Sequence, residues 1–474
     1  MEPIDVPERL GRWSSGRGPL YVLLAGRLRQ LIDDGELPPG TPLPPDRQFA
    51  THLAVGRSTV VAAYDLLETE GRIVRRRGSG TRVAGAAAAA HPHTTGAPMF
   101  LHLLEPWPEV ISLACAAPDA PPPEIARAYA RIVPELAAMT AEIGYHPAGY
   151  PPLRVALAER YTRLGAPTRP EQILVTNGGQ QALTLLARAQ LRPGDRVLLE
   201  SPTYPGALEA FQEASAVLHP LPLGLTGFEA AVRRHPVRLA YLTPTFQNPT
   251  GAVLSRLVRR RVAEAAEAAG VPLLVDEVLA DLAFPGEPTP PPTAADVDSV
   301  LTVSSLSKNL WGGLRVGWIR ADPALIARLA RLRAVGDLGG NLPAQMAATH
   351  LVAELDTLVR VHAAERKAGH DKLIAELAAQ LPDWDVAPVR GGQSLWIRLP
   401  HGDGGSFAQT ALRHDIAILA GSGLDITGAG TDRIRLHFRH PPEVLSEAVA
   451  RLAAAWQAYR PPARSAVTAP AFAM

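Results

Sequence analysis

The sequence predicts an α/β protein in which a small N-terminal helix-turn-helix unit precedes a large domain built on a mostly parallel sheet. In the first 85 residues, apolar side chains recur at helical spacing and a short basic hairpin follows them. From about residue 100, short β-branched runs alternate with helical stretches, which is typical of a sheet covered by helices. The length of 474 residues is sufficient for two or three domains.

Composition narrows the class of protein. Hydrophobic residues make up 47% of the chain and charged residues 20%, as in a soluble globular protein with large cores. The formal net charge of +1 provides no overall field that would attract nucleic acid or a membrane, so any DNA binding must come from a local patch. The single cysteine, Cys115, excludes an internal disulfide and suits the cytoplasm. We expect no signal peptide, because the first residues are acidic and lack an apolar run, and we expect no membrane span and no metal site.

The N-terminal unit is predicted to contain three helices and a hairpin. An amphipathic helix covers about residues 19–34, and a second helix covers residues 47–53 with Asp46 as its N-cap. A third helix runs over about residues 57–70, and two short strands at 72–83 surround a Gly-Ser-Gly tip. This order is the geometry of a winged helix-turn-helix, in which the third helix enters the DNA major groove and the hairpin meets phosphates.

Two parts of this unit are candidates for contact with DNA. If Val60, Tyr64 and Leu67 face inward, the N-terminal end of the third helix is left exposed. Residues 72–82 carry five Arg and no acid, which focuses positive charge on the hairpin. The candidate phosphate contacts there are Arg75, Arg76 and Arg77. The alternative interpretation is a small helical bundle with a solvated basic hairpin.

About 65 residues of this unit resemble the DNA-binding domain of GntR-type repressors. The resemblance rests on landmarks in the family's order, among them Leu37-Pro38-Pro39-Gly40, Arg57-Ser58-Thr59-Val60, Glu70-Gly71 and Gly78-Ser79-Gly80-Thr81. It implies DNA contacts from Arg47, Arg57, Ser58, Thr59 and Gly80. The sequence departs from the family's pattern at Pro45-Asp46 and at Gly56, and neither departure removes an Arg that would contact bases.

Composition also predicts where the domains end. We place the DNA-binding domain at residues 10–85 and an Ala- and Pro-rich linker at 86–104. The large domain then covers 105–460, and a disordered tail rich in Pro and Ala covers 461–474.

A lysine that follows a predicted strand organises the large domain. Of the 47 basic residues only three are Lys, and one of them, Lys308, lies just after the apolar run 300–303. An α/β sheet places ligands at such strand ends, and a buried Lys can become a nucleophile whereas Arg cannot. We interpret Lys308 as the amine that holds pyridoxal phosphate in a Schiff base. Taken alone, a Lys in a Ser- and Gly-rich loop would more often be a solvated surface residue.

Other predicted strand ends carry residues suited to the same cofactor. Gly178-Gly179 turns a strand into a helix and would expose backbone N–H groups to a phosphate. Tyr204 could stack on a flat ring, and Asp276 could keep a pyridine nitrogen protonated. Asn248 can donate an amide hydrogen bond, and Arg315 can form two hydrogen bonds to a phosphate. Each has a structural alternative, such as a rim Tyr, an Asn-Pro turn or an ion-paired Asp.

In this order, the motifs resemble the fold-type I aminotransferases over about residues 105–455. The resemblance implies pyridoxal phosphate and a set of residues around it. The phosphate would be held by Gly178, Gly179, Gln180, Ser305 and Arg315; the rest of the cofactor would meet Tyr204, Asn248, Asp276 and Lys308. It further implies that Tyr145 reaches the phosphate of a partner subunit in a homodimer, and that Arg435 grips a substrate carboxylate. Leu279 stands where the family commonly has Tyr, which implies weak or absent transaminase activity.

The fusion of the two units resembles the MocR subfamily of GntR regulators, and Trp311-Gly312-Gly313-Leu314-Arg315 is more similar to its YczR subgroup than to its PdxR subgroup. The resemblance implies a homodimeric, domain-swapped or head-to-tail transcription factor that binds an operator in double-stranded DNA. It would sense pyridoxal phosphate, or an amino acid or amine, through an aldimine at Lys308. The alternatives are a working aminotransferase that carries a DNA-binding domain, and a constitutive DNA binder with an inactive large domain.

Overall fold

The computed structural model describes residues 6, 10, 13, 19–33, 36–76, 80–84, 109–118 and 120–461. The predicted linker at 86–104 lies outside the described residues, as does the predicted tail beyond Pro461. Among the residues that are described, no helix combines the length and the hydropathy required to cross a membrane.

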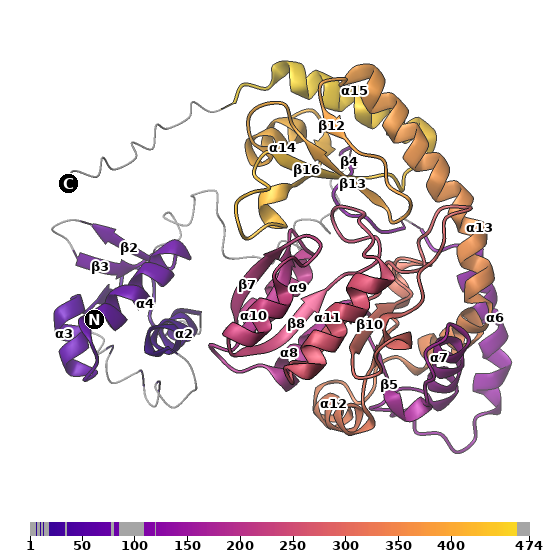
Figure 1. The fold of residues 1–474 in the computed structure, drawn as a ribbon, viewed down its shortest axis with the longest axis horizontal. Helices are drawn as coiled ribbons and strands as arrows, with labels where there is room; N and C mark the ends of the chain where they lie inside the picture. The colour runs from indigo at the N-terminus through magenta and orange to yellow at the C-terminus, as the bar shows by residue number, and fades with distance from the viewer. Residues whose placement is uncertain are drawn as a thin grey trace.

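The N-terminal unit is a winged helix-turn-helix (Figure 1), as predicted. Its elements are α2 (Leu20–Asp33), β1 (Pro42–Leu43), α3 (Asp46–His52), α4 (Arg57–Thr69), β2 (Ile73–Arg76) and β3 (Gly80–Val83). The strands form an antiparallel sheet in the order β1-β3-β2, so the hairpin gains a third strand that the sequence analysis missed. The inward orientation of Val60, Tyr64 and Leu67 is confirmed, because all three are fully buried.

The predicted cap of α3 is wrong by one residue. Pro45 is the N-cap, with extended φ and ψ of −56° and 143°, and Asp46 is the first helical residue. No side chain caps the helix. Proline already supplies the backbone angles that a helix entry requires, and the carboxylate of Asp46 in the first turn still suits the positive end of the helix dipole.

The large domain is organised by a seven-stranded sheet with the order β5-β11-β10-β9-β8-β6-β7. Its strands are β5 (Ile173–Thr176), β6 (Arg196–Ser201), β7 (Val217–Pro222), β8 (Val237–Leu242), β9 (Leu273–Asp276), β10 (Leu301–Ser305) and β11 (Gly317–Arg320). All neighbours are parallel except β11, which is antiparallel to both β5 and β10. The strands that the sequence predicts at 172–176, 196–200, 239–242, 271–275 and 300–303 correspond to β5, β6, β8, β9 and β10, whereas β7 and β11 were not predicted.

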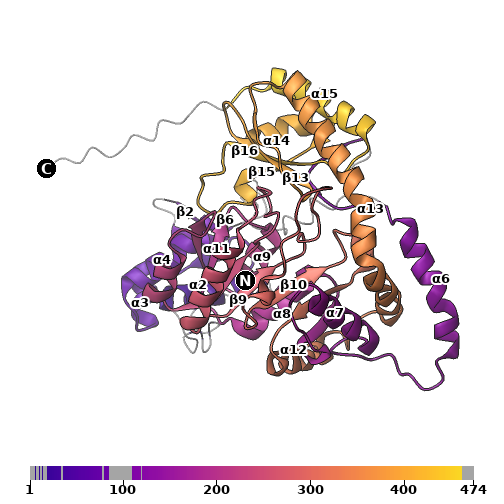
Figure 2. The same ribbon diagram turned by 45° about the vertical axis from the view of Figure 1, so that its right-hand side comes forward.

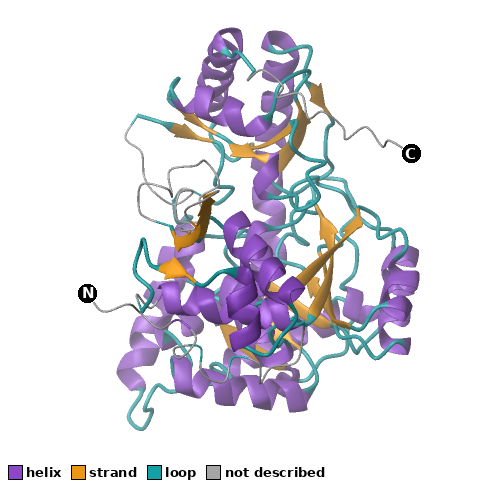
Figure 3. Ribbon diagram, turned by 90° about the vertical axis from the view of Figure 1, so that its left-hand side faces the viewer, coloured by secondary structure: helices purple, strands orange, loops and turns teal. Residues whose placement is uncertain are grey.

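Both faces of this sheet are buried, because successive residues of a strand pack into different cores. In β5, Leu174 belongs to one core and Val175 to the other, and in β9 Leu274 and Val275 divide in the same way. Helices flank the strands (Figure 3). They are α6 (Pro123–Ala138), α7 (Pro151–Arg163), α8 (Gly179–Gln190), α9 (Pro205–Glu213), α10 (Phe228–Arg234), α11 (Arg256–Ala268) and α12 (Pro323–Gly336).

A long helix, α13 (Leu342–Gln380), leads from the large sheet into a C-terminal α/β unit, where it lies beside α15 (Figure 2). That unit contains a four-stranded antiparallel sheet in the order β12-β13-β16-β15. Its elements are β12 (Asp385–Val386), β13 (Ser394–Arg398), α14 (Gly404–Leu412), β14 (Ile416–Ala417), β15 (Leu419–Ala420), β16 (Arg433–His437) and α15 (Pro442–Ala458). The early strand β4 (Ile111–Ser112) returns to pair with β14.

Four short 3₁₀ turns complete the described elements: η1 (Pro170–Gln172), η2 (Thr293–Ala295), η3 (Gly312–Leu314) and η4 (Gly421–Gly423).

Gly149 shows how closely the segment before α7 packs on the sheet. Its φ is +105°, and a Cβ atom there would lie 2.4 Å from Cγ2 of Val175 in β5. We expect Gly149→Ala to reduce the free energy of unfolding by about 1–3 kcal/mol more than the control Gly286→Ala, because overpacking adds to the backbone strain. Gly286 has a comparable positive φ of +83° but no atom within 4 Å of the added methyl group. Chemical denaturation measures both losses, and equal losses would contradict the packing argument.

Candidate functional site

The large sheet collects the predicted cofactor residues at one edge. Asp276 is the last residue of β9, and Lys308 follows β10. Asn248, Tyr204 and Gly178 follow β8, β6 and β5 in the same way. These five strands run parallel to one another, so their carboxyl ends meet at one edge of the sheet. Residues separated by more than 100 positions in the sequence therefore surround one region.

Lys308 is held in a desolvating environment. Its Nζ donates a 2.6 Å hydrogen bond to the carbonyl oxygen of Ala116. The pKa of the Lys308 amine is lowered to about 8, chiefly by burial and also by the nearby guanidinium of Arg435, while Cys115 and Asp276 act in the opposite direction. The neutral, nucleophilic form of this amine is therefore more populated near neutral pH than in an ordinary lysine.

Asp276 is buried and engaged by two donors. Its carboxylate accepts hydrogen bonds from the Tyr241 hydroxyl at 2.8 Å and from the backbone N–H of Val278 at 3.0 Å. Burial raises the pKa of Asp276, although these bonds and the charge of Lys308 counteract the rise. A buried carboxylate of this kind is stabilised by a cation, and a protonated ring nitrogen would provide one. Tyr241 was missed because it lies inside an apolar strand, where it resembles a core residue.

A loop at the start of α8 forms a cradle that suits a phosphate. Gly178 has a φ of +90°, and a Cβ atom there would lie 3.0 Å from Nη2 of Arg315. The Arg315 side chain is exposed and donates to the backbone carbonyl of Asn177. The first turn of α8, which begins at Gly179, directs backbone N–H groups to the same loop. The donors present therefore fit an anion.

Two further predicted phosphate residues are fixed by local hydrogen bonds. Nε2 of Gln180 donates to the carbonyl of Gly206 at 2.8 Å, and its Oε1 accepts from the hydroxyl of Tyr204 at 3.2 Å. The buried hydroxyl of Ser305 accepts from the N–H of Ser307 at 3.3 Å. The structure thus brings Gln180 and Tyr204 together directly.

Arg435 is a buried cation with an incomplete set of acceptors. Nη1 donates to Oδ1 of Asn248 at 2.9 Å, and Nη2 donates to the carbonyl of Ala114. Nε has no hydrogen-bond partner among the described residues. Burial lowers the pKa of Arg435 to about 10. A carboxylate ligand would supply the missing acceptor, which is the role that was predicted.

The segment 113–117 was missed by sequence reasoning. The carbonyl of Ala116 accepts from Lys308, and the carbonyl of Ala114 accepts from Arg435. Cys115 lies between them and is partly buried. Backbone carbonyls carry no side-chain signal, so no motif could have indicated this contact.

The remaining predicted residues differ in their surroundings. Leu279 packs in an apolar cluster with Phe246, Leu282 and Ala283, so no hydroxyl donor occupies its position. Tyr145 is 60% exposed in the single chain, and no hydrogen bond of the described residues joins it to the cluster at the sheet edge. Within the described part of the chain, no group of His, Cys, Asp and Glu could hold a metal ion.

The candidate DNA surface divides into exposed and engaged residues. Arg47, Arg57 and Ser58 are exposed, Thr59 is partly exposed, and Gly80 is exposed with a φ of +79°. These positions lie at the starts of α3 and α4 and at the hairpin. The side chain of Arg76 and all of Arg77 lie outside the described residues.

Arg75 is engaged by the side chains of α4. It forms ion pairs with Asp65 at 2.7 Å and Glu68 at 3.7 Å. Its guanidinium also lies 5.4 Å from the ring centroid of Tyr64. These contacts hold the hairpin against α4, so Arg75 has a structural role in addition to the predicted phosphate contact.

Comparison with known proteins agrees with both halves of this arrangement. Residues 108–452 match the aminotransferase class I and II family, and residues 20–83 match bacterial regulatory proteins of the gntR family. The chain belongs to the MocR-type regulators of the GntR family. This family joins a DNA-binding domain to an aminotransferase domain, and it implies pyridoxal phosphate as the cofactor.

Relatives and solved structures resemble different portions of the chain. YdcR of Escherichia coli, named an uncharacterized HTH-type transcriptional regulator, is 31% identical over 85% of this chain and 91% of its own length. The probable rhizopine catabolism regulatory protein MocR of Rhizobium meliloti is 29% identical over 77% of this chain and 78% of its own length. The crystal structure of LysN, an α-aminoadipate aminotransferase of Thermus thermophilus, has a TM-score of 0.70 and 28% identity, and covers 77% of this chain and 95% of its own.

The pKa of Lys308 leads to a pH prediction. Only the neutral amine attacks an electrophile, so labelling of Lys308 by an amine-reactive reagent should rise with pH, with a midpoint near 8. Arg435→Gln removes a cation that disfavours the ammonium form, and it should move this midpoint to higher pH. Mass spectrometry of peptides labelled between pH 6 and 11 measures the profile. A midpoint close to the ordinary lysine value, about 10.4, would contradict the buried environment.

Proposed function

We propose that this regulator is a homodimer that binds an operator in double-stranded DNA and senses an amino acid or amine at Lys308. The observation that carries the proposal is that the Lys308 amine and the Arg435 guanidinium bind carbonyls of the same segment, Ala116 and Ala114. An α-amino acid carries an amine that could replace the Lys308 amine on the cofactor carbonyl, and a carboxylate that could pair with the Arg435 guanidinium. In this proposal residues 10–85 bind DNA, residues 86–104 link the domains, and residues 105–460 sense the effector in the cytoplasm.

The cofactor would be held by the residues of the sheet edge. Pyridoxal phosphate, when bound, supplies a carbonyl carbon that exchanges amines and a ring that withdraws electrons. In our assignment, Lys308 would attach it, Asp276 would pair with its ring nitrogen, and Tyr204 would stack on its ring. The ring hydroxyl would meet Asn248, and the phosphate would meet Gly178, Gly179, Gln180, Ser305 and Arg315. The amide of Asn248 suits this assignment, because Arg435 donates to its Oδ1 and its NH₂ group could serve as the donor to the ring hydroxyl.

A hydrogen-bonded chain supports communication from Lys308 to the long helix α13. Nδ2 of Asn309, the next residue, donates to Asp281 at 3.0 Å. Arg160 donates to Asp281 at 2.8 Å and to Asp356 of α13 at 3.1 Å. An effector that releases Lys308 would alter the first member of this chain. It could shift the protein between two arrangements only by as much as it binds them with different affinity.

Exposed apolar side chains support the homodimer. Ile143 is 80% exposed, Tyr145 60%, Val335 92% and Leu338 45%. The segments that carry them are adjacent, since a Cβ atom at Gly339 would lie 2.0 Å from the carbonyl oxygen of His146. A second copy of the chain would cover this surface through a two-fold interface and bring Tyr145 to its partner's phosphate site. Two DNA-binding domains would then require paired half-sites.

A working aminotransferase is the second candidate. The structural similarity to LysN and the intact set of cofactor residues favour it. The buried, apolar Leu279 disfavours it, because the site lacks the hydroxyl that was expected there. The two candidates differ in turnover: an enzyme releases a keto acid, whereas a sensor retains its amino acid.

Visible absorption spectra of the protein test the proposed function. We expect purified protein supplied with pyridoxal phosphate to show an absorption band that borohydride removes, and Lys308→Ala to lack this band. One or more amino acids of a panel should shift the band without release of keto acid. Arg435→Gln should reduce the response to amino acids more than the response to simple amines, because only the former carry a carboxylate. A wild-type protein without the band would refute a sensor at Lys308, and steady release of keto acid would favour the enzyme.

DNA binding is tested by a second pair of variants. Arg57→Ala should weaken specific operator binding by roughly 1–3 kcal/mol and leave stability unchanged, because the exposed side chain has no described ion-pair partner and its loss removes a base or phosphate contact. Arg75→Ala should also lower the stability of the N-terminal unit, because it removes the ion pairs to Asp65 and Glu68. Gel-shift titrations and thermal unfolding measure the two effects. Equal operator binding by Arg57→Ala and wild type would refute the proposed groove contact.

A further inference from the structure

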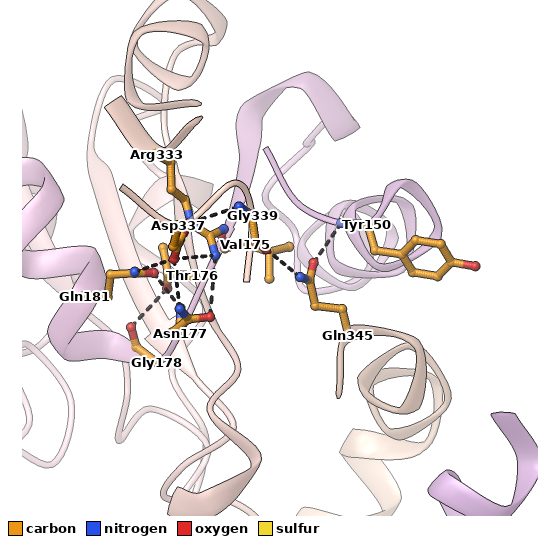
Figure 4. A network of polar contacts seen from close by, with 10 residues as sticks. All are labelled: Tyr150, Val175, Thr176, Asn177, Gly178, Gln181, Arg333, Asp337, Gly339 and Gln345. Atoms are coloured by element: carbon orange, nitrogen blue, oxygen red, sulfur yellow. Dashed lines mark hydrogen bonds and ion pairs between the residues drawn. The ribbon is translucent and has the colours of Figure 1, made fainter. Parts of the chain in front are cut away.

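Asp337, at the C-terminal end of α12, accepts hydrogen bonds from several parts of the chain (Figure 4). Its Oδ2 accepts from Nδ2 of Asn177 at 2.9 Å and from Nε2 of Gln181 at 2.8 Å. Its Oδ1 accepts from the N–H of Gly339 at 3.0 Å and lies 3.0 Å from Nε of Arg333. Burial would raise the pKa of Asp337, but these bonds and the charge of Arg333 lower it overall, so the carboxylate is charged at neutral pH.

One side of this network holds the phosphate cradle. Asn177 is the residue before Gly178, and its backbone carbonyl accepts from Arg315. Its backbone N–H donates to Oε1 of Gln181 at 2.8 Å, while the other end of that amide donates to Asp337. Asn177 is thus fixed through both its backbone and its side chain. Gly178 follows Asn177 in the chain, and Arg315 donates to the Asn177 carbonyl, so the positions of both depend on the position of Asn177. Asp337 in turn accepts hydrogen bonds from the side chains of Asn177 and Gln181.

The other side of the network holds the segment that follows Tyr145. The carbonyl of Gly339 accepts from Nε2 of Gln345 at 2.8 Å, and Oε1 of Gln345 accepts from the N–H of Tyr150 at 2.8 Å. The chain passes too closely here for any side chain at two glycines. A Cβ atom at Gly339 would lie 2.0 Å from the carbonyl of His146, and one at Gly340 would lie 2.4 Å from Oδ1 of Asn177.

We propose that Asp337 is a positioning residue that holds the phosphate cradle at Asn177 and Gly178 in register with the segment 145–150. Asp337 acts through Asn177 and Gln181 and does not itself contact the ligand. The inference rests on the proposed function, because the anion in the cradle is taken to be the phosphate of pyridoxal phosphate. Its consequence is that Asp337 determines how strongly the protein prefers pyridoxal phosphate to pyridoxal, which has the same ring and aldehyde but no phosphate.

The full-length Asp337→Asn variant tests this preference. The substituted amide has one acceptor and introduces two N–H donors where Asn177 and Gln181 already donate. We expect the dissociation constant for pyridoxal phosphate to rise about tenfold, since a hydrogen bond to a charged group is lost, while that for pyridoxal stays unchanged. Absorbance titrations with both compounds give the two constants. If the ratio of the two dissociation constants in Asp337→Asn equals that of the wild type, the proposal is overturned. This includes the case in which both affinities fall by the same factor, as they would after a general loss of structure.

An exchange of the two side chains provides the rescue. In the double variant Asn177→Asp with Asp337→Asn, the side chain at 337 donates the hydrogen bond and the carboxylate at 177 accepts it. That carboxylate would lie next to a cation, because the Arg333 guanidinium lies 3.5 Å from Oδ1 of Asn177. The double variant should recover most of the phosphate preference, and a preference no higher than that of Asp337→Asn would contradict the role of this pair. Glu264→Gln is the matched control, because it also neutralises a carboxylate in an i,i+4 pair with Arg, but on the exposed surface of α11.

Further variants separate this inference from the proposed function. If Asp337→Asn does not fold, as judged by thermal unfolding, Gln181→Met removes one donor to Asp337 and should lower the phosphate preference in the same direction; an unchanged preference overturns the proposal. Wild-type protein that binds neither compound at Lys308 would refute the proposed function and this inference together. Wild-type protein that forms the Lys308-dependent band, with the same preference in Asp337→Asn, would refute only the positioning role.

Discussion

The site depends on a sheet that is buried on both faces. Successive side chains of each strand pack into two different cores, as Leu174 and Val175 do in β5. Polar or charged side chains on either face would be buried without water, which costs free energy. Polar groups are placed where the strands end. Because five strands run in the same direction, Lys308, Asp276 and Gly178 reach one edge from distant parts of the sequence. The antiparallel strand β11 lies between β5 and β10. Its carboxyl end lies at the opposite edge of the sheet, and no predicted site residue directly follows it.

Desolvation then sets the chemical character of this edge. It lowers the pKa of Lys308 and of Arg435 and raises that of Asp276, so each group is less stable in its charged form than it would be in water. The chain satisfies these groups only in part. Lys308 and Arg435 use backbone carbonyls of the segment 113–117, and Nε of Arg435 has no acceptor among the described residues. A ligand with a carboxylate would supply the acceptor that the chain does not provide.

The two halves of the chain use charge in different ways. The formal charge of the whole chain is only +1, and the N-terminal unit depends on where its Arg residues lie. Arg57 remains exposed at the start of α4, whereas Arg75 is held by Asp65 and Glu68 and fixes the hairpin to the helix. In the large domain, Asp337 likewise accepts hydrogen bonds from separate segments. It fixes the positions of these segments relative to one another and contributes little to the net charge.

The sequence by itself determined the order of elements and the residue types that carry chemistry. A Lys after an apolar strand, glycines between a strand and a helix, and an Asp at a strand end are local patterns, and the structure places Lys308, Gly178 and Asp276 at such positions. Only the tertiary structure decided the partners. The strands β1 and β11 and the hydroxyl of Tyr241 depend on long-range packing, and the carbonyls of Ala114 and Ala116 have no side-chain signal at all. Asp337 lies 160 residues from Asn177, and such a contact is specified by how the helices and strands pack, a property that no local pattern records.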